Sequence, residues 1–186
     1  MDLRTCLAII AAASLPVSAW AAGEAPYAGW EGRGIKALSA RQIDDLQRGR
    51  GMGMALPAEL NGYPGPLHVL ELADQLELTA DQRAETQRLF DAMQAQAIAL
   101  GEQVIAAEAA LDRLFATGAA SDAATLAAAV EVGRRQGALR GHHLRYHVAM
   151  REVLSRHQLM RYQQLRGYAA DGPHGHGGHG DTGHVR

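Results

Sequence analysis

Histidines are the side chains whose number and spacing indicate metal chemistry in this sequence. Four lie in a glycine-rich C-terminal tail and two are four residues apart in a predicted helix: His174, His176, His179 and His184 in the tail, His143 and His147 in the helix. Imidazole nitrogens bind Zn, Cu and Ni, and a flexible tail needs no preformed geometry. Each group is therefore a candidate metal site. The alternatives are a solvated tail without a ligand, and a polar or core role for the helical pair.

Arginines and apolar side chains share the same predicted helix. Arg134 and Arg145 are 11 residues apart and fall on one line of an α-helix, and Arg140 and Arg151 form a second line. An apolar stripe lies between the lines and comprises Val132, Leu139, Tyr146, Met150 and Val153. An apolar surface flanked by arginines suits loose binding of unfolded polypeptides. The alternative is that the stripe packs into the core.

Motifs for catalysis are absent from the sequence. It contains no nucleophile elbow, P-loop, dinucleotide fingerprint or HExxH motif, and the glycines of residues 49–53 follow a predicted helix, whereas phosphate-binding loops follow a strand. The carboxylates are distributed as helix surface, with no sign of a paired acid and base. We therefore expect a protein that is not an enzyme and that requires no cofactor.

The hydrophobic pattern predicts the elements that must position these residues. Apolar residues spaced by three and four indicate two long helices, at about 79–117 and 121–154, and few residues join them, so the helices must pair antiparallel. Shorter helices are expected at about 66–76 and 155–166. The fold class is therefore all-α, a long helical hairpin with short flanking helices.

Three glycines interrupt the second long helix at intervals of four residues. Gly133, Gly137 and Gly141 lie on the side away from the apolar stripe, and each costs about 1 kcal/mol relative to alanine. The favoured interpretation is a close backbone approach or a bend in the helix. A direct role in ligand binding is the alternative.

Composition and charge restrict the class of protein further. The 186 residues include 5% aromatics, which indicates a thin helix-on-helix core, and the formal net charge of −2 gives no overall attraction to nucleic acid. The charge is nevertheless segregated: residues 66–116 hold nine acids and three arginines, whereas residues 130–166 hold eight arginines and two acids. The two halves could attract each other across the hairpin.

The N-terminus resembles an export signal. Arg4 precedes an apolar run in residues 7–15, and Ala19-Trp20-Ala21 forms a small-residue cleavage site. We therefore expect a signal peptide at 1–21, a periplasmic protein, and no membrane-spanning helix. The expected organisation continues with an irregular segment containing short helices at 22–65, the hairpin domain at 66–168 and a disordered tail at 169–186.

A repeated pentapeptide marks three predicted helix starts. In each copy a Ser or Thr can cap the helix while a Gln three residues later reaches back to the cap, at Leu38-Ser39-Ala40-Arg41-Gln42, Leu78-Thr79-Ala80-Asp81-Gln82 and Leu154-Ser155-Arg156-His157-Gln158. Such capping boxes also start helices in unrelated proteins. Here, however, the last two copies bracket the predicted hairpin.

That placement resembles the two LTxxQ motifs of the Spy/CpxP family of periplasmic proteins, which includes metal-binding relatives. Leu78, Thr79 and Gln82 match the first motif, and Leu154, Ser155 and Gln158 match the second with Ser in place of Thr. The resemblance covers about residues 66–168. It implies a curved helical hairpin that forms a homodimeric cradle, an envelope stress response, and a membrane sensor kinase as a further partner.

Two functions follow from these observations. The favoured hypothesis is an ATP-independent periplasmic chaperone that binds unfolded or misfolded proteins on its basic, partly apolar helical surface. The alternative is a periplasmic protein that binds or senses Zn, Cu or Ni through the tail histidines and through His143 and His147.

Overall fold

The computed structural model describes residues 25–168, and these residues are all-helical, as the sequence predicts. The expected signal peptide and the histidine-rich tail lie outside the described residues. Residues 25–32 belong to a separate compact unit with a short 3-10 helix, Trp30–Gly32, in which the rings of Tyr27 and Trp30 are 5.5 Å apart. Residues 33–168 belong to the second unit, which contains all the features discussed below.

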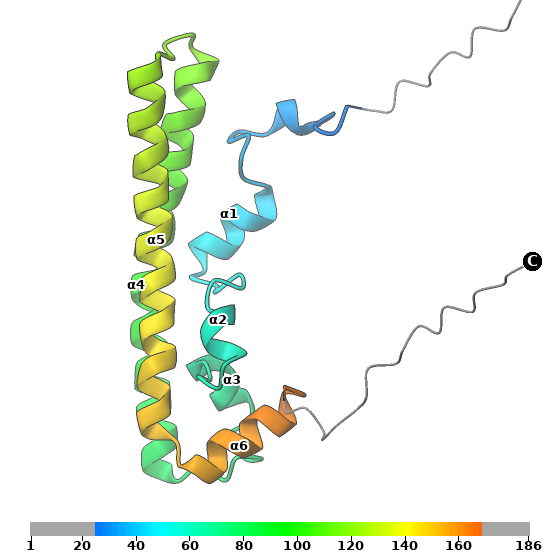
Figure 1. Ribbon diagram of the computed structural model, residues 1–186, viewed down its shortest axis with the longest axis vertical. Coiled ribbons are helices and arrows are strands. Elements are labelled where there is room, and N and C mark those ends of the chain that lie inside the picture. The colour runs from blue at the N-terminus through cyan, green and yellow to red at the C-terminus, as the bar shows by residue number, and fades with distance from the viewer. Residues whose placement is uncertain (1–24, 169–186) are drawn as a thin grey trace, which may run out of the picture. The chain divides into compact units, whose positions relative to one another are not determined.

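Two long helices, α4 (Ala80–Ala116) and α5 (Asp122–Val153), lie side by side along their length (Figure 1). A short turn joins them, in which Gly118 has a positive φ of 70° that favours glycine. The short helix α6 (Arg156–Leu165) follows α5 directly at the open end of the pair. We call the pair the α4–α5 hairpin.

Residues 33–71, here called the N-terminal segment, lie along the α4–α5 hairpin. The segment contains α1 (Ala40–Gln47), α2 (Leu56–Glu59) and α3 (Pro66–Glu71), and these helices contact α4 or α5 (Figure 1). The helix expected at 66–76 ends at Glu71, because the chain turns before α4 and Glu77 adopts a positive φ of 51°. The segment is therefore a packed layer on the hairpin.

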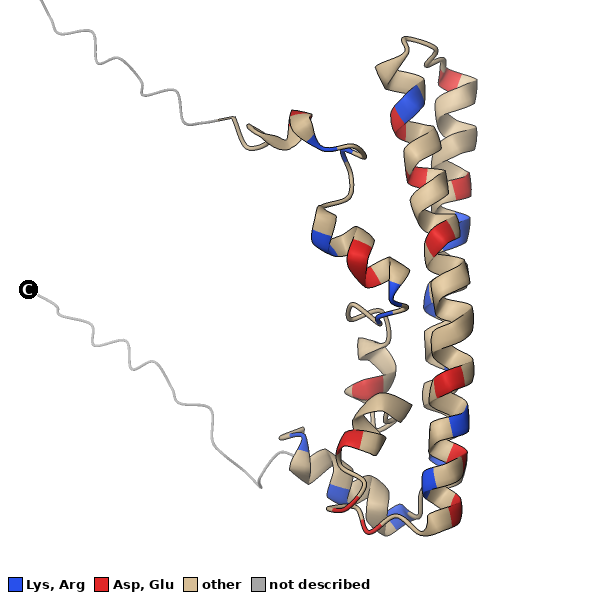
Figure 2. Cartoon of the chain, turned by 180° about the vertical axis from the view of Figure 1, so that it is seen from behind, with Lys and Arg blue, Asp and Glu red and all other residues tan. Residues whose placement is uncertain are grey.

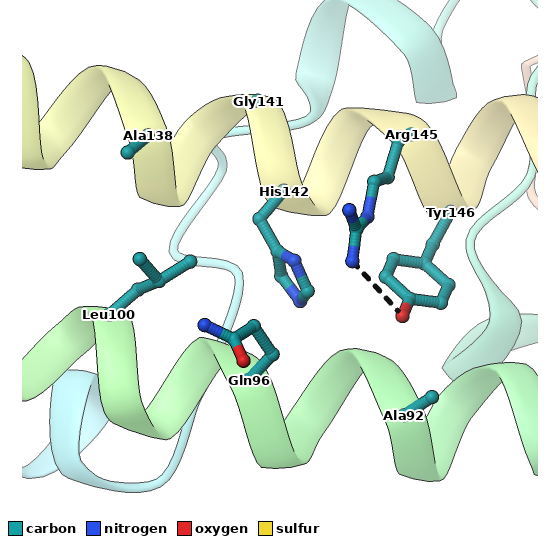
Figure 3. Close-up of a pocket in the computed structure, with 8 residues that line it drawn as sticks. All are labelled: Ala92, Gln96, Leu100, Ala138, Gly141, His142, Arg145 and Tyr146. Atoms are coloured by element: carbon teal, nitrogen blue, oxygen red, sulfur yellow. Dashed lines mark hydrogen bonds between the residues drawn. The ribbon is translucent and has the colours of Figure 1, made fainter.

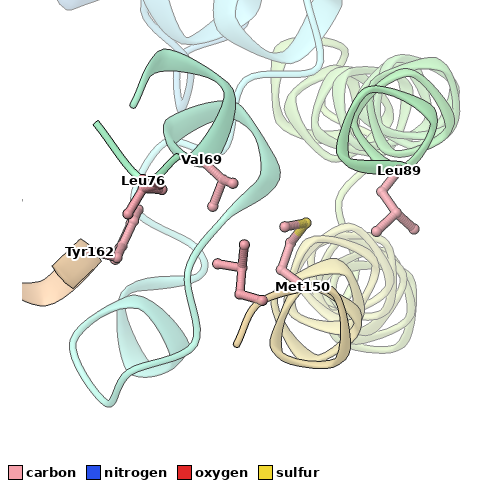
Figure 4. Packing of buried hydrophobic residues seen from close by; sticks show 6 residues of the cluster. Val69, Leu76, Leu89, Met150 and Tyr162 are labelled. Carbon is pink, nitrogen blue, oxygen red and sulfur yellow. The ribbon is translucent and has the colours of Figure 1, made fainter. Parts of the chain in front are cut away.

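Two hydrophobic clusters hold this layer in place. One lies near α6 and is formed by Val69, Leu76, Leu89, Met150, Leu154 and Tyr162 (Figure 4). The other lies further along the hairpin and is formed by Leu38, Leu46, Ala97, Val104 and Leu139. Both clusters combine side chains of the hairpin with side chains from residues before α4, so the hydrophobic core closes only when the N-terminal segment is in place.

Gly101 allows α1 to approach α4 closely. A Cβ atom added to Gly101 would lie 2.4 Å from the carbonyl oxygen of Leu46, at the C-terminal end of α1. No other residue type fits there without moving the backbone. From sequence alone, a glycine that permits close helix packing looks the same as a glycine that only destabilises its helix. The sequence therefore did not indicate the contact.

The charges on the hairpin are paired locally. Glu131 binds both Arg134 and Arg135 within α5, and Glu85 binds Arg88 within α4. Among the described residues no ion pair joins α4 to α5, so the attraction that the charge segregation allows is not realised as salt bridges. Acidic and basic residues lie along both helices (Figure 2). In the same range, no helix is both long enough and apolar enough to cross a membrane.

All three predicted capping boxes are present. The hydroxyl oxygens of Ser39, Thr79 and Ser155 each accept a hydrogen bond from the backbone N–H three residues later. The side-chain oxygen of the Gln at that position accepts one from the backbone N–H of the cap residue, at 2.9 to 3.1 Å. The motif therefore sets the starts of α1, α4 and α6.

Two of these Gln side chains also bind each other. The amide nitrogen of Gln82 donates to Oε1 of Gln158, and the amide nitrogen of Gln158 donates to Oε1 of Gln82, both at 2.9 Å. Gln82 also donates to the carbonyl oxygen of Val153, and Gln158 donates to that of Leu76. The pair therefore joins the start of α4, the end of α5, the start of α6 and the chain before α4.

Replacing Gln158 by alanine will destabilise the fold much more than the same change at Gln42. Gln158→Ala removes both hydrogen bonds between the two amides and leaves the Leu76 carbonyl without its side-chain donor in a buried place, which costs about 2 to 3 kcal/mol. Gln82 keeps its hydrogen bond to the Val153 carbonyl. Gln42→Ala removes only an exposed capping contact and costs about 1 kcal/mol or less. Urea unfolding measures both, and equal losses would contradict a bridging role for Gln158.

Candidate functional site

An open groove of about 660 Å³ runs between α4 and α5 and is the candidate binding site (Figure 3). Small, polar and basic side chains line it: Ala92, Gln96 and Leu100 from α4, and Ala138, Gly141, His142, Arg145 and Tyr146 from α5. The groove exists because three of these residues are alanine or glycine and leave space between the helices. Two of the lining residues, Arg145 and Tyr146, belong to the client surface predicted from the sequence.

Stacked side chains form the polar wall of the groove. The Arg145 guanidinium lies over the ring of Tyr146 at 5.1 Å, and the same ring packs edge-on against His142 at 5.1 Å between centroids. His142 is buried and its Nε2 donates to the carbonyl oxygen of Met93 at 2.8 Å. Burial lowers the pKa of His142, and its carbonyl partner opposes that effect only in part. The imidazole is therefore neutral at neutral pH, and Arg145 supplies the positive charge.

The predicted apolar stripe is largely internal. Val132, Leu139 and Met150 are buried, and Tyr146 and Val153 are half-buried. Leu139 and Met150 belong to the two core clusters with side chains of the N-terminal segment. The other interpretation of the stripe, in which it packs into the core, therefore applies to Leu139 and Met150. Leu139 and Met150 are unavailable to a client while the N-terminal segment covers the hairpin, whereas Tyr146 also lines the groove.

The four predicted arginines, in contrast, are exposed. Arg134 is held by Glu131 through two hydrogen bonds of 2.8 Å, and these bonds, with those from Arg135, lower the pKa of Glu131 to about 2. The Arg151 guanidinium lies 4.6 Å from the ring centre of Tyr63 in the N-terminal segment. Arg145 alone among the four lines the groove.

The helical histidine pair is buried beneath the N-terminal segment. His147 binds the carbonyl oxygen of Tyr63 through Nδ1 at 2.7 Å, and the same nitrogen is 3.7 Å from the carboxylate of Glu59. His143 is 3% exposed, and its Nε2 has no hydrogen-bond partner. The structure provides no group of three or more His, Cys, Asp or Glu able to hold a metal within residues 25–168. The tail histidines fall outside that range, so metal binding by the tail remains a prediction.

A buried carboxylate connects α2 to α6. Glu59 accepts a hydrogen bond from the Tyr162 hydroxyl at 2.5 Å and another from the backbone N–H of Gly65 at 3.1 Å, and Arg166 lies 3.6 Å away. Burial, together with the neighbouring carboxylate, raises the pKa of the Tyr162 hydroxyl. The sequence does not reveal this cluster, because a single Glu between Pro57 and Gly62 has no signal that marks it as buried.

Comparison of the chain with protein-family models, with curated proteins and with solved structures finds no match. Function is therefore inferred from the geometry of the described residues and from the motifs in the sequence. The two motifs that carry the family resemblance, at 78–82 and 154–158, are brought together by the Gln82–Gln158 amide pair.

The stability of the fold will fall as the pH falls from about 6.5 to about 4. Burial first, and the nearby His142 and His147 second, lower the pKa of His143 from its ordinary 6.5 to about 4. Between these pH values residue 143 binds a proton in the unfolded chain but not in the folded chain. Lowering the pH therefore decreases the free energy of unfolding by about 3 kcal/mol at most. Urea unfolding at several pH values measures the slope.

Variants at two histidines separate this effect from general acid sensitivity. His143→Gln removes the titrating group and reduces the pH dependence, with the remainder including the contribution of His142. The control is His157→Gln, which removes a histidine on the exposed surface of α6. An unchanged slope in His143→Gln would show that His143 does not contribute.

Proposed function

We propose that the protein is an ATP-independent periplasmic chaperone that holds non-native polypeptides in the groove between α4 and α5. The proposal rests on three properties of that groove in combination: it is open, small side chains form much of its walls, and Arg145 gives it a positive charge. A binding site for one small ligand is concave and closed around its ligand, whereas a site for unfolded chains must accept many sequences along an open surface.

The chemistry of the lining suits an extended polypeptide. Arg145 and Gln96 provide hydrogen-bond donors for backbone carbonyl groups or acidic side chains, and Tyr146 and Leu100 provide apolar contacts. Arg145 also attracts acidic segments at a distance, and this attraction weakens with salt.

The family resemblance supports the same proposal. In this chain the two LTxxQ-like motifs cap α4 and α6, and their Gln side chains close the open end of the hairpin. The resemblance also underlies three further parts of the proposal: export to the periplasm, a homodimeric cradle and contact with a membrane sensor kinase. Each of these rests on sequence motifs.

Filling the groove will weaken protection of an unfolded client. The purified protein is expected to slow aggregation of an unrelated denatured protein at low salt, measured by light scattering, and the effect should decrease as salt increases. Ala92→Trp places an indole in the groove and should reduce the protection several-fold. Ala95→Trp is the matched control, since Ala95 is an exposed alanine of α4 that does not line the groove.

The charge is tested in the same assay. Arg145→Gln should reduce protection at low salt and remove most of its salt dependence, whereas Arg161→Gln on the exposed surface of α6 should not. If the unaltered protein has no effect at several-fold molar excess, the proposed function is wrong. If Ala92→Trp protects as well as Ala95→Trp, clients bind elsewhere on the molecule.

A further inference from the structure

The outer face of α5 carries an apolar stripe that residues 33–168 leave largely exposed. Leu126, Val130 and Val148 are 64%, 63% and 55% exposed, although they are large apolar residues. With Leu144 and the three exposed glycines they form a single line along the helix: Leu126, Val130, Gly133, Gly137, Gly141, Leu144 and Val148. All seven lie within about 40° of one direction, since successive residues of an α-helix turn by about 100°. We call this line the outer stripe.

The outer stripe is symmetric about Gly137. Its members follow one another at intervals of 4, 3, 4, 4, 3 and 4 residues, which read the same in both directions. An antiparallel copy of the same helix that crosses at Gly137 therefore places glycine against glycine and apolar residue against apolar residue. Gly133 meets the partner's Gly141, Val130 meets the partner's Leu144, and Leu126 meets the partner's Val148.

Gly133 and Gly137 have no steric reason to be glycine among the described residues, and Gly141 borders the groove. A Cβ atom built at Gly133, Gly137 or Gly141 meets no atom within 4 Å, so neither a close approach in the described residues nor a steric limit requires glycine there. Each nevertheless weakens α5 by about 1 kcal/mol relative to alanine. Small residues at intervals of four allow two helix backbones to approach closely, and this gain is available only from a second helix.

Charge along α5 favours the antiparallel direction. Residues 122–133 contain Asp122 and Glu131 and no basic residue, whereas residues 141–152 contain Arg145 and Arg151 against Glu152. In an antiparallel pair the first range, with a charge of −2, faces the second range, with a charge of +1, in the partner. A parallel pair would place each range against its own copy, and both contacts would be repulsive.

We propose that two copies of the protein associate through this face, with the α5 helices antiparallel about a two-fold axis at Gly137. The interface is isologous, because the same stripe serves both copies. Gly141 and Ala138 connect the outer stripe to the groove, so the axis places the two grooves along the same side of the dimer. This surface and direction are those of the homodimer in the proposed function, and the association does not depend on client binding.

Disulfide trapping tests the interface and its direction together. Cys6 is the only cysteine, so single cysteines can be introduced in a Cys6→Ser background. Gly137→Cys should form a covalent dimer under mild oxidation, because the two copies of residue 137 face each other. Val130→Cys and Leu144→Cys should crosslink when the two variants are mixed and only weakly when each is alone. Disulfides need Cα atoms within about 7 Å, so the readout is specific.

A bulky side chain at the crossing point separates association from folding. Gly137→Leu should not lower the helical content or the unfolding midpoint of the monomer, since nothing occupies that space and leucine favours the helix more than glycine does. It should shift sedimentation from dimer to monomer. Ala127→Leu is the control, because exposed Ala127 lies on the same helix, about 80° from Gly137. Strong self-crosslinking of Val130→Cys would show a parallel pair and overturn the proposal. A monomer at the highest soluble concentration, or an unaffected dimer in Gly137→Leu, would also overturn it.

Discussion

The reciprocal amide pair between Gln82 and Gln158 is the constraint on which the rest of the structure depends. Each side chain uses both amide hydrogens and accepts two hydrogen bonds, so a buried polar group is fully satisfied at the point where four chain segments meet. The pair sets the position of α6 against the start of α4. From there α6 contributes Tyr162 both to the hydrophobic cluster and to the hydrogen bond with Glu59.

Small residues decide how the layers approach one another. The chain has few aromatics, so the core is thin and side chains cannot fill wide spaces between helices. Gly101 lets α1 lie directly on α4, and Ala97 is fully buried in the same cluster. On the outer side of α5, Ala138 and Gly141 leave the groove open instead. The same residue types therefore make close contacts on one face of the hairpin and an accessible surface on the other.

The polar groups beneath the N-terminal segment make this layer sensitive to acid. His143 and His147 lie where α5 meets residues 51–65, and on that side His147 contacts the carbonyl of Tyr63 and the carboxylate of Glu59. A charged imidazole at His143 has no partner for its Nε2, so protonation opposes the packing of the segment. Since that segment covers Leu139 and Met150, the covering of the predicted client stripe depends on the same contacts.

What the sequence by itself determined is local. Periodicity and capping residues predicted the all-helical fold and the three helix starts at Ser39, Thr79 and Ser155, because these depend on neighbours within a few residues. Only the tertiary structure decided which apolar face of α5 is internal, that Gln82 and Gln158 bind each other across 76 residues, and that Glu59 meets Tyr162 across 103. Such contacts depend on where distant segments pack, and periodicity along one helix contains no information about the partner that covers each face.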